Sequence, residues 1–146
     1  MGGTTLNNTL AHAKNIGLEV EEAPLRGSLN AVLLEGGRVI LNEARTEATK
    51  RYALAHECGH WKYGHDWRLE HTIERDEYQA DRYAAHLLIS PIEYARAEEM
   101  FEGHIGAISR ELLVPAHVLK IWQADADSVI KTALATLTLP GERHAS

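Results

Sequence analysis

The segment HECGHWKYGH, residues 56–65, places three histidines, one glutamate and one cysteine within ten residues. Its first five residues match the pattern H-E-x-x-H, with His56 and His60 four positions apart. On a helix, residues four apart differ by about 40° around the axis, so both imidazoles can point toward one metal ion. Zinc accepts neutral imidazole nitrogens at about 2.0–2.1 Å in a tetrahedral arrangement. The spacing therefore predicts two ligands of a zinc site.

Glu57 follows the first of these histidines and lies close to the same helix face. Its carboxylate could take a proton from a water molecule whose pKa a metal ion lowers to about 7. We therefore predict that Glu57 is the catalytic base. Cys58 falls roughly opposite His60 on the helix, which predicts a small buried residue and not a ligand. The alternative is a chance H-E-x-x-H on a polar helix, and a third ligand would decide between the two.

One candidate for the third ligand follows the metzincin pattern, with Gly three residues and a ligand six residues after the second histidine. Those positions hold Tyr63 and Asp66, and Gly64 and His65 each stand one residue away from the expected places. Without glycine at the bend, an extra helical turn would keep Asp66 pointing away. The pattern therefore disfavours the metzincin arrangement.

The better candidate is Glu77, in the segment DEYQADRYAAHLL. At about 100° per residue, Glu77 and Asp81 fall on the inner edge of the apolar stripe of this helix. Two carboxylates that face a core are costly unless they are paired or bind a metal ion. We predict that Glu77 is the third ligand. Asp81, one turn further on, would accept a hydrogen bond from the far nitrogen of a ligating histidine.

A zinc peptidase also needs a group that stabilises the oxyanion of the tetrahedral intermediate. The candidates lie in or near the loop between the two ligand helices, and the pattern does not choose among them: Tyr63, His65, His71 and Tyr78. Five of the histidines outside the H-E-x-x-H pair are otherwise expected to be surface or hydrogen-bonded residues: His65, His71, His86, His104 and His117.

Composition limits the class of protein. The chain has 146 residues, of which 45% are hydrophobic and 25% charged, as in one globular domain. A net charge of −6 argues against a broad nucleic-acid or anionic-membrane surface. No apolar run approaches the roughly 20 residues of a membrane helix, and the N-terminus lacks the regions of a secretory signal. Cys58 is the single cysteine, so no internal disulfide is possible and we expect a cytoplasmic protein. We also expect it to be a monomer.

The pattern of apolar residues predicts an α+β fold, in which a small antiparallel or mixed sheet packs on a helical, zincin-like core followed by short C-terminal helices. Gly36 and Gly37 separate two apolar runs, which predicts a β-hairpin with a primed turn. One domain is expected over residues 1–124 and a loosely packed or partly helical tail over 125–146. The expected helices cover residues 4–16, 46–64 with Thr46 as the cap, 72–89, 91–101 opened by Pro91, 105–113 and 115–124.

The segments YALAHECGHWKYGH and ERDEYQADRYAAHLLISPIEY resemble the ImmA/IrrE metallo-endopeptidases. Members of that family have an A-H-E-x-G-H helix followed by an E-x-E-A-N-x-F-A-A-x-L-L-M-P-like helix. The resemblance covers about residues 29–123. This sequence departs from the family pattern at three positions. Gln79 replaces the common second glutamate, Asp81 stands where asparagine is usual, and Tyr83 stands where phenylalanine is usual.

The resemblance implies a gluzincin-like endopeptidase that uses one zinc ion per chain and cleaves a partner repressor with a helix-turn-helix domain. Such repressors control phages, mobile elements or stress responses. The resemblance also implies that an edge strand beside the site holds the substrate through main-chain hydrogen bonds. We predict that this edge strand consists of Val39, Ile40, Leu41 and Asn42.

Two other functions are compatible with parts of the sequence. A non-catalytic zincin could inactivate its repressor by binding alone, although such a protein would not need Glu57. The segment AISRELLVPAHVLKIW could form a DNA-binding helix-turn-helix, but Arg110 and Lys120 are its only fixed positive charges. Because phosphate contacts dominate DNA affinity, we expect these helices to pack against the core and not to bind nucleic acid.

Overall fold

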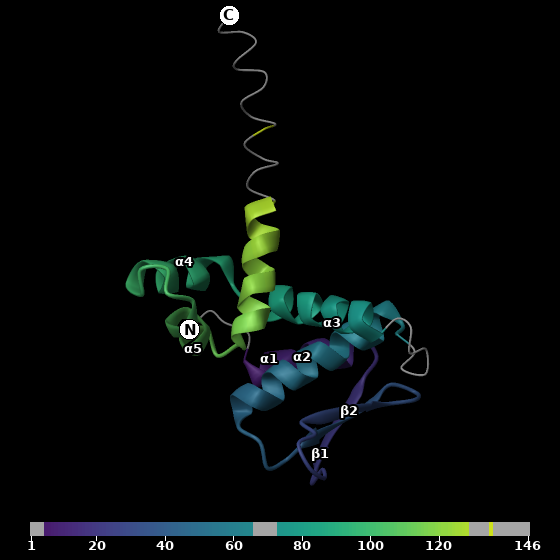
Figure 1. Ribbon diagram of the computed structural model, residues 1–146. Coiled ribbons are helices and arrows are strands. Elements are labelled where there is room, and N and C mark those ends of the chain that lie inside the picture. The colour runs from purple at the N-terminus through teal and green to yellow at the C-terminus, as the bar shows by residue number, and fades with distance from the viewer. Residues whose placement is uncertain (1–4, 66–72, 129–134, 136–146) are drawn as a thin grey trace, which may run out of the picture.

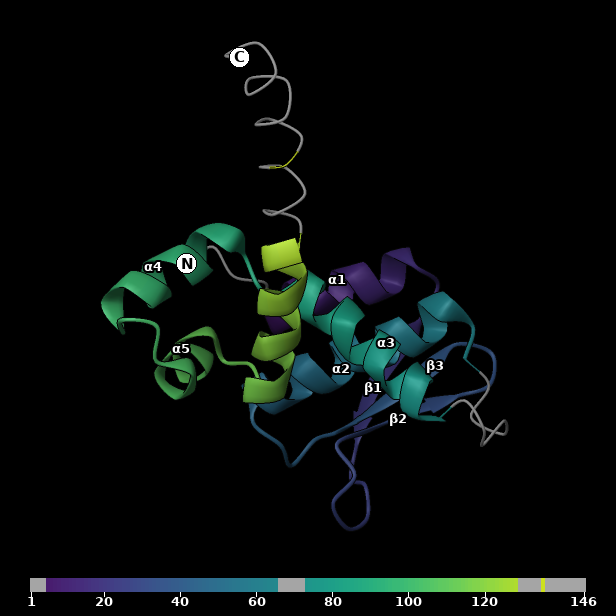
Figure 2. The ribbon, with the colours of Figure 1, turned by 45° about the horizontal axis from the view of Figure 1, so that its top comes forward.

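A computed structural model describes residues 5–65, 73–128 and 135 of the chain. Helix α2 lies between the sheet on one side and α3 on the other (Figure 1), and the C-terminal helix stands beside α4 and α5 (Figure 2). The disfavoured ligand Asp66, the oxyanion candidate His71 and most of the predicted tail lie outside the described residues. The elements are α1 (Leu6–Asn15), β1 (Glu19–Ala23), β2 (Ala31–Leu34), β3 (Arg38–Asn42), α2 (Glu47–Tyr63), α3 (Ile73–Leu88), α4 (Pro91–Met100), α5 (Ile105–Leu112) and a helix over residues 116–128.

The three strands form one mixed sheet in the order β1-β3-β2. Strand β3 pairs in parallel with β1 and antiparallel with β2. A small mixed sheet packed on helices confirms the predicted α+β class. Strand β1 was not among the predicted elements, although Leu18 and Val20 alternate with glutamates in the two-residue period of a strand.

The prediction that Val39–Asn42 form the edge strand is wrong. These residues belong to β3, which has a paired neighbour on each side and is therefore the central strand. Val39 and Leu41 are fully buried, as expected for a strand that is covered on a face and paired along both edges. The unforeseen parallel pairing with β1 occupies one side of β3, so β1 and β2 form the two edges of the sheet.

The predicted hairpin between β2 and β3 is confirmed, but its turn differs from the prediction. Leu34 pairs with Arg38, which leaves a connection of Glu35, Gly36 and Gly37. Positive φ falls on Gly36 (81°) and Gly37 (85°), and not on Glu35. A primed turn needs positive φ at its first central residue, so this turn is not of the primed type.

The helix ends follow the predicted signals. The Thr46 hydroxyl accepts a hydrogen bond from the Thr49 N–H at 3.2 Å and caps α2. Ser90 caps α4 in the same way, and Pro91 occupies the first turn of that helix. Each cap satisfies a backbone N–H that has no partner inside the helix.

The C-terminal helices are part of the hydrophobic core. Ile108 of α5 and Val118, Leu119 and Trp122 of the following helix are all buried in one apolar cluster with residues of α3. This burial supports a packing role and not a DNA-reading role. The last helix continues without a break through residue 128. No helix in the described parts of the chain is long and apolar enough to cross a membrane.

Helices α2 and α3 approach each other closely at Gly59. A Cβ atom at this position would lie 2.7 Å from the Ala80 Cα, 2.9 Å from the Ala80 carbonyl oxygen and 3.0 Å from the Tyr83 Cβ. Two of these three atoms are backbone, so they cannot move without the whole helix. Glycine at position 59 therefore permits the short distance between the two helices.

We expect Gly59→Ala to destabilise the protein by about 1–3 kcal/mol, the usual cost of overpacking a core. The measurement is urea unfolding followed by circular dichroism. Gly106→Ala in α5 is the matched control, because there the new Cβ would meet only the far ends of the His104 and Arg110 side chains, at 3.3 and 3.5 Å for the nearest atoms. It should be neutral or stabilising by up to about 1 kcal/mol. Equal stability of Gly59→Ala and the wild type would contradict the packing argument.

Candidate metal centre

The two helices bring His56, His60 and Glu77 to one point. The Nε2 atoms of the two histidines are 3.1 Å apart. Oε1 of Glu77 lies 3.3 Å from His56 Nε2, and its Oε2 lies 2.5 Å from His60 Nε2. Candidate ligand atoms of all three residues fall within 4.8 Å of one another. The predicted ligand set thus converges in space, and its assignment to a metal ion is taken up below as a proposal.

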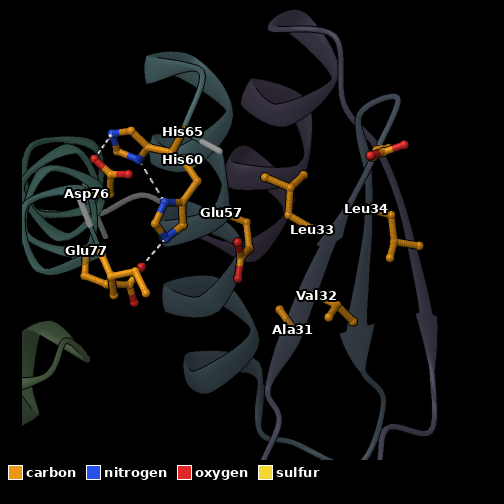
Figure 3. Close-up of a pocket in the computed structure, with 11 residues that line it drawn as sticks. Ala31, Val32, Leu33, Leu34, Glu57, His60, His65, Asp76 and Glu77 are labelled. Atoms are coloured by element: carbon orange, nitrogen blue, oxygen red, sulfur yellow. Dashed lines mark hydrogen bonds and ion pairs between the residues drawn. The ribbon is translucent and has the colours of Figure 1, made fainter. Parts of the chain in front are cut away.

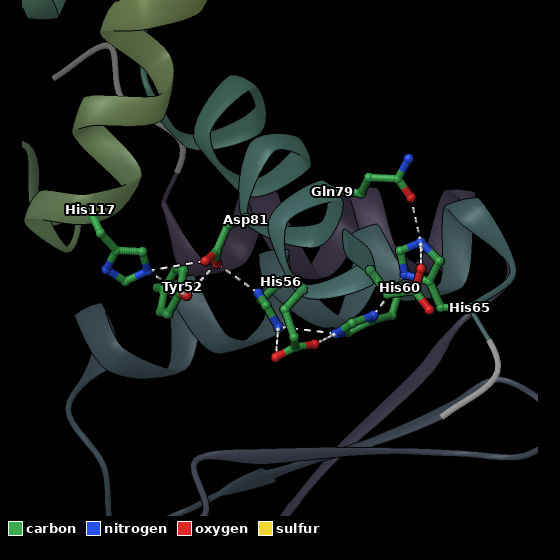
Figure 4. A network of polar contacts seen from close by, with 9 residues as sticks. Tyr52, His56, His60, His65, Gln79, Asp81 and His117 are labelled. Carbon is green, nitrogen blue, oxygen red and sulfur yellow. Dashed lines mark hydrogen bonds and ion pairs between the residues drawn. The ribbon is translucent and has the colours of Figure 1, made fainter. Parts of the chain in front are cut away.

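The far nitrogens of both histidines have hydrogen-bond partners (Figure 4). His56 Nδ1 lies 2.8 Å from Oδ1 of Asp81, and His60 Nδ1 lies 2.9 Å from Nδ1 of His65. A carboxylate can only accept, so His56 carries a proton on Nδ1, and in the neutral ring its Nε2 would be the nitrogen available to a metal ion. Asp81 therefore lies where the sequence predicts an outer partner, one helical turn beyond Glu77.

The donor set fits a zinc ion. In a tetrahedron with metal–nitrogen bonds of about 2.0–2.1 Å, neighbouring ligand atoms are about 3.3 Å apart. Two of the three observed separations, 3.1 and 3.3 Å, are close to this value, and the third is shorter at 2.5 Å. Lone pairs on imidazole nitrogens that face a carboxylate form a set of acceptors, which is the chemistry of a cation site.

Two side chains that were not among the predicted site residues also contact Asp81. The Tyr52 hydroxyl donates to Asp81 Oδ1 at 2.5 Å, and His117 Nε2 lies 3.1 Å from Oδ2. Tyr52 precedes His56 by one helical turn, a spacing that could have indicated a shared face. His117 comes from the C-terminal helix, and no local pattern connects it with α3. The C-terminal helix is thus linked to the site through Asp81.

These contacts shift the pKa values of the two histidines in opposite directions. Burial opposes the charged form of His56, but the hydrogen bond and the charge of Asp81 outweigh it and raise the pKa of His56. Burial, together with the nearby charge of His56, lowers the pKa of His60. Asp81 itself is partly buried, yet hydrogen bonds from His56 and Tyr52 lower its pKa.

Glu57 faces a cavity of about 750 Å³ between α2, α3 and the edge of the sheet (Figure 3). Burial raises the pKa of the Glu57 carboxyl to about 7, with the charge of Glu77 acting in the same direction and that of His56 against it. The whole of β2 lines this cavity, beside His60 and Glu77 of the cluster. The neighbouring Cys58 is fully buried, as predicted, and burial raises the pKa of its thiol to about 12.

The candidates for oxyanion stabilisation occupy different surroundings. Both ring nitrogens of His65 are engaged, Nδ1 with His60 and Nε2 with Gln79 Oε1 at 2.8 Å. Tyr63 lines a separate pocket together with Arg82 and other residues of α3. Tyr78 is half exposed on α3. The choice of an oxyanion-stabilising residue stays a prediction.

A helix with His-Glu-x-x-His, a second helix that adds a glutamate, and a small mixed sheet beside them are typical of the zincin-like class of metallopeptidases. The sequence matches the family Peptidase_M78, described as the IrrE N-terminal-like domain, over residues 13–121. The match covers most of the chain, so the chain belongs to this peptidase family, and the resemblance to ImmA/IrrE proteins is confirmed. A search of curated proteins gave no match.

We predict that the purified protein contains about one zinc ion per chain, measured by elemental analysis. His60→Ala and Glu77→Ala should each weaken zinc binding by more than the roughly 10- to 100-fold loss that is typical of an outer hydrogen-bond partner. His86→Ala is the control, because His86 bonds to Asp125 and not to the cluster. If both ligand variants keep full zinc occupancy in competition with a chelator, the ligand set is wrong.

We predict that Asp81→Asn weakens zinc binding by about 10- to 100-fold while the fold is kept. Asparagine retains an acceptor for His56 Nδ1–H, but it loses the negative charge that makes the imidazole a stronger ligand. The measurement is chelator competition, with thermal unfolding of the metal-free protein run in parallel. An unchanged zinc affinity would show that Asp81 does not act on the metal site.

Proposed function

We propose that the protein is a zinc-dependent endopeptidase. The observation that carries the proposal is the convergence of His56, His60 and Glu77 beside Glu57, at the wall of a cavity that the edge strand β2 also lines. Zinc fits the donor set, and His56, His60 and Glu77 would hold it. The ligand-bearing helices thus lie next to a surface that can bind an extended peptide.

Zinc, when bound, would supply a Lewis acid that acidifies water and polarises the carbonyl of the scissile peptide bond. Glu57 takes the proton of the attacking water and then delivers it to the nitrogen of the leaving amine. A carboxyl whose pKa is about 7 is suited to both steps, because general acid–base catalysis is most efficient when the pKa is near the working pH. His56 and His60 are held in place by their outer hydrogen bonds, so the site needs little rearrangement.

The substrate binds as an additional strand on the outer edge of β2 in this proposal. The other edge of β2 is paired with β3, and all four residues of β2 line the cavity. A peptide in this position would form main-chain hydrogen bonds with β2, and its side chains would alternate between the two faces of the sheet. This replaces Val39–Asn42 with Ala31–Leu34 as the substrate strand.

The substrate class in the proposal is a helix-turn-helix transcriptional repressor. The support is the family resemblance of the two ligand helices, together with membership of the IrrE N-terminal-like family. In this proposal the enzyme is cytoplasmic and monomeric, and it does not contact nucleic acid directly. The buried thiol of Cys58 fits a reducing compartment.

We expect Glu57→Gln to reduce peptide cleavage by at least about 10²–10⁴-fold, because glutamine keeps the size of the side chain but cannot accept a proton. The measurement is a cleavage time course, followed by mass spectrometry, against the small helix-turn-helix proteins of the source genome. Zinc content and repressor binding, measured in parallel, should stay close to the wild type.

Glu74→Gln is the matched control, since it makes the same change of charge on an exposed residue of α3 that does not line the cavity. It should cleave at the wild-type rate. If Glu57→Gln relieves repression in a reporter assay as well as the wild type, proteolysis is not the mechanism. Inactivation of the repressor by binding alone would then replace the peptidase function.

A further inference from the structure

The end of α2 brings His65 back over His60. Gly64 adopts the left-handed conformation, with φ 65° and ψ 34°. The Gly64 N–H donates to the Trp61 carbonyl at 3.1 Å, and the His65 N–H donates to the His60 carbonyl at 3.0 Å. This pair of bonds is the Schellman motif, which places the residue after the glycine next to the residue five positions earlier. A hydrophobic contact often joins these two positions, but here both hold histidine.

The His65 side chain is held on both sides. Its Nδ1 lies 2.9 Å from His60 Nδ1, and its Nε2 lies 2.8 Å from Gln79 Oε1 and 3.5 Å from Asp76 Oδ1. Only 8% of the side chain is exposed. The ring thus connects α3 to the far side of a predicted metal ligand on α2 (Figure 4).

The hydrogen-bond partners fix the proton positions along this chain. Two oxygens that accept, from Gln79 and Asp76, face His65 Nε2, so this nitrogen carries the proton. In the neutral ring Nδ1 is then an acceptor, and it requires a proton on His60 Nδ1. In a neutral His60 ring that is protonated on Nδ1, Nε2 holds the lone pair that a metal ion would take, 2.5 Å from Glu77 Oε2. The opposite arrangement would place an unprotonated His65 Nε2 against oxygen atoms that cannot donate.

We infer that His65 is a positioning residue for the metal ligand His60, and that Gln79 holds His65 in the required tautomer. The inference rests on the proposed zinc site and adds an outer partner for its second histidine. It also gives a role to Gln79, which stands where the resembling family commonly has glutamate. The neutral amide of Gln79 accepts a hydrogen bond from His65 Nε2–H and brings no charge of its own.

The experiment measures zinc affinity by chelator competition and the visible absorption of the cobalt-substituted protein, without any substrate. His65→Leu fills the space but offers no acceptor, so it should weaken zinc binding by about 10- to 100-fold and change the cobalt spectrum. His65→Asn places an amide oxygen near the former Nδ1 and should restore most of the affinity. Gln79→Met leaves both histidines in place but removes the nearer of the two oxygens that face His65 Nε2, so it should give a smaller loss.

His12→Leu is the control, because His12 is a partly buried histidine that bonds to Tyr83 and to no residue of the cluster. Thermal unfolding of the metal-free variants separates loss of folding from loss of zinc binding. Tight zinc binding by His65→Leu, or equal losses in His65→Leu and His65→Asn, would overturn the positioning role while leaving the zinc site intact. Absence of zinc binding in the wild type would overturn the proposed function, and this inference with it.

Discussion

The short distance between α2 and α3 at Gly59 and Ala80 is the constraint on which the site depends. Gly59 lies between the two histidines of α2, and Ala80 lies between Glu77 and Asp81 of α3. The atoms that bring the helices together are therefore within one turn of the atoms that would bind the metal ion. Metal–ligand distances are tolerated to within about 0.2 Å. A side chain at position 59 would need a larger displacement, since its Cβ would lie only 2.7 Å from the Ala80 Cα.

The same helix pair also holds the far ring nitrogens of the two histidines, and their hydrogen-bond partners differ. His56 meets the carboxylate of Asp81, which also accepts from Tyr52 and His117. His60 meets a neutral ring that is held by Gln79 and Asp76. A charged partner strengthens an imidazole as a ligand more than a neutral one does. The site therefore combines two different histidines. His56 is the more basic of the two, and its pKa is raised, whereas His60 is fixed in direction and its pKa is lowered.

Local patterns in the sequence were sufficient for the helices and for the residues that they carry. The i, i+4 histidine pair and the phase of Glu77 and Asp81 on an apolar stripe depend only on helical geometry, and the structure brings these residues together. The order of the strands depends on which segments pair at long range, so the parallel strand β1 was missed and β3 was mistaken for the edge. The contact of His117 with Asp81 could not be predicted for the same reason, because it joins residues 36 positions apart in the sequence. His65 could have been anticipated from Gly64, because a left-handed residue at a helix end folds the next residue back.

The corrected strand order also bears on the proposal that one small domain holds both a metal site and a peptide substrate. Pairing with β1 and β2 buries Val39 and Leu41 of β3 completely, so this strand serves only as a support. Ala31 and Leu33 of β2 pack toward the core shared with α2, while Leu34 is more than one-third exposed. A peptide paired with β2 would therefore continue the sheet into the cavity that Glu57 faces. In the proposed function, the helices would determine where the metal ligands lie and the edge strand β2 would determine where a peptide bond lies, and Glu57 faces the cavity that both line.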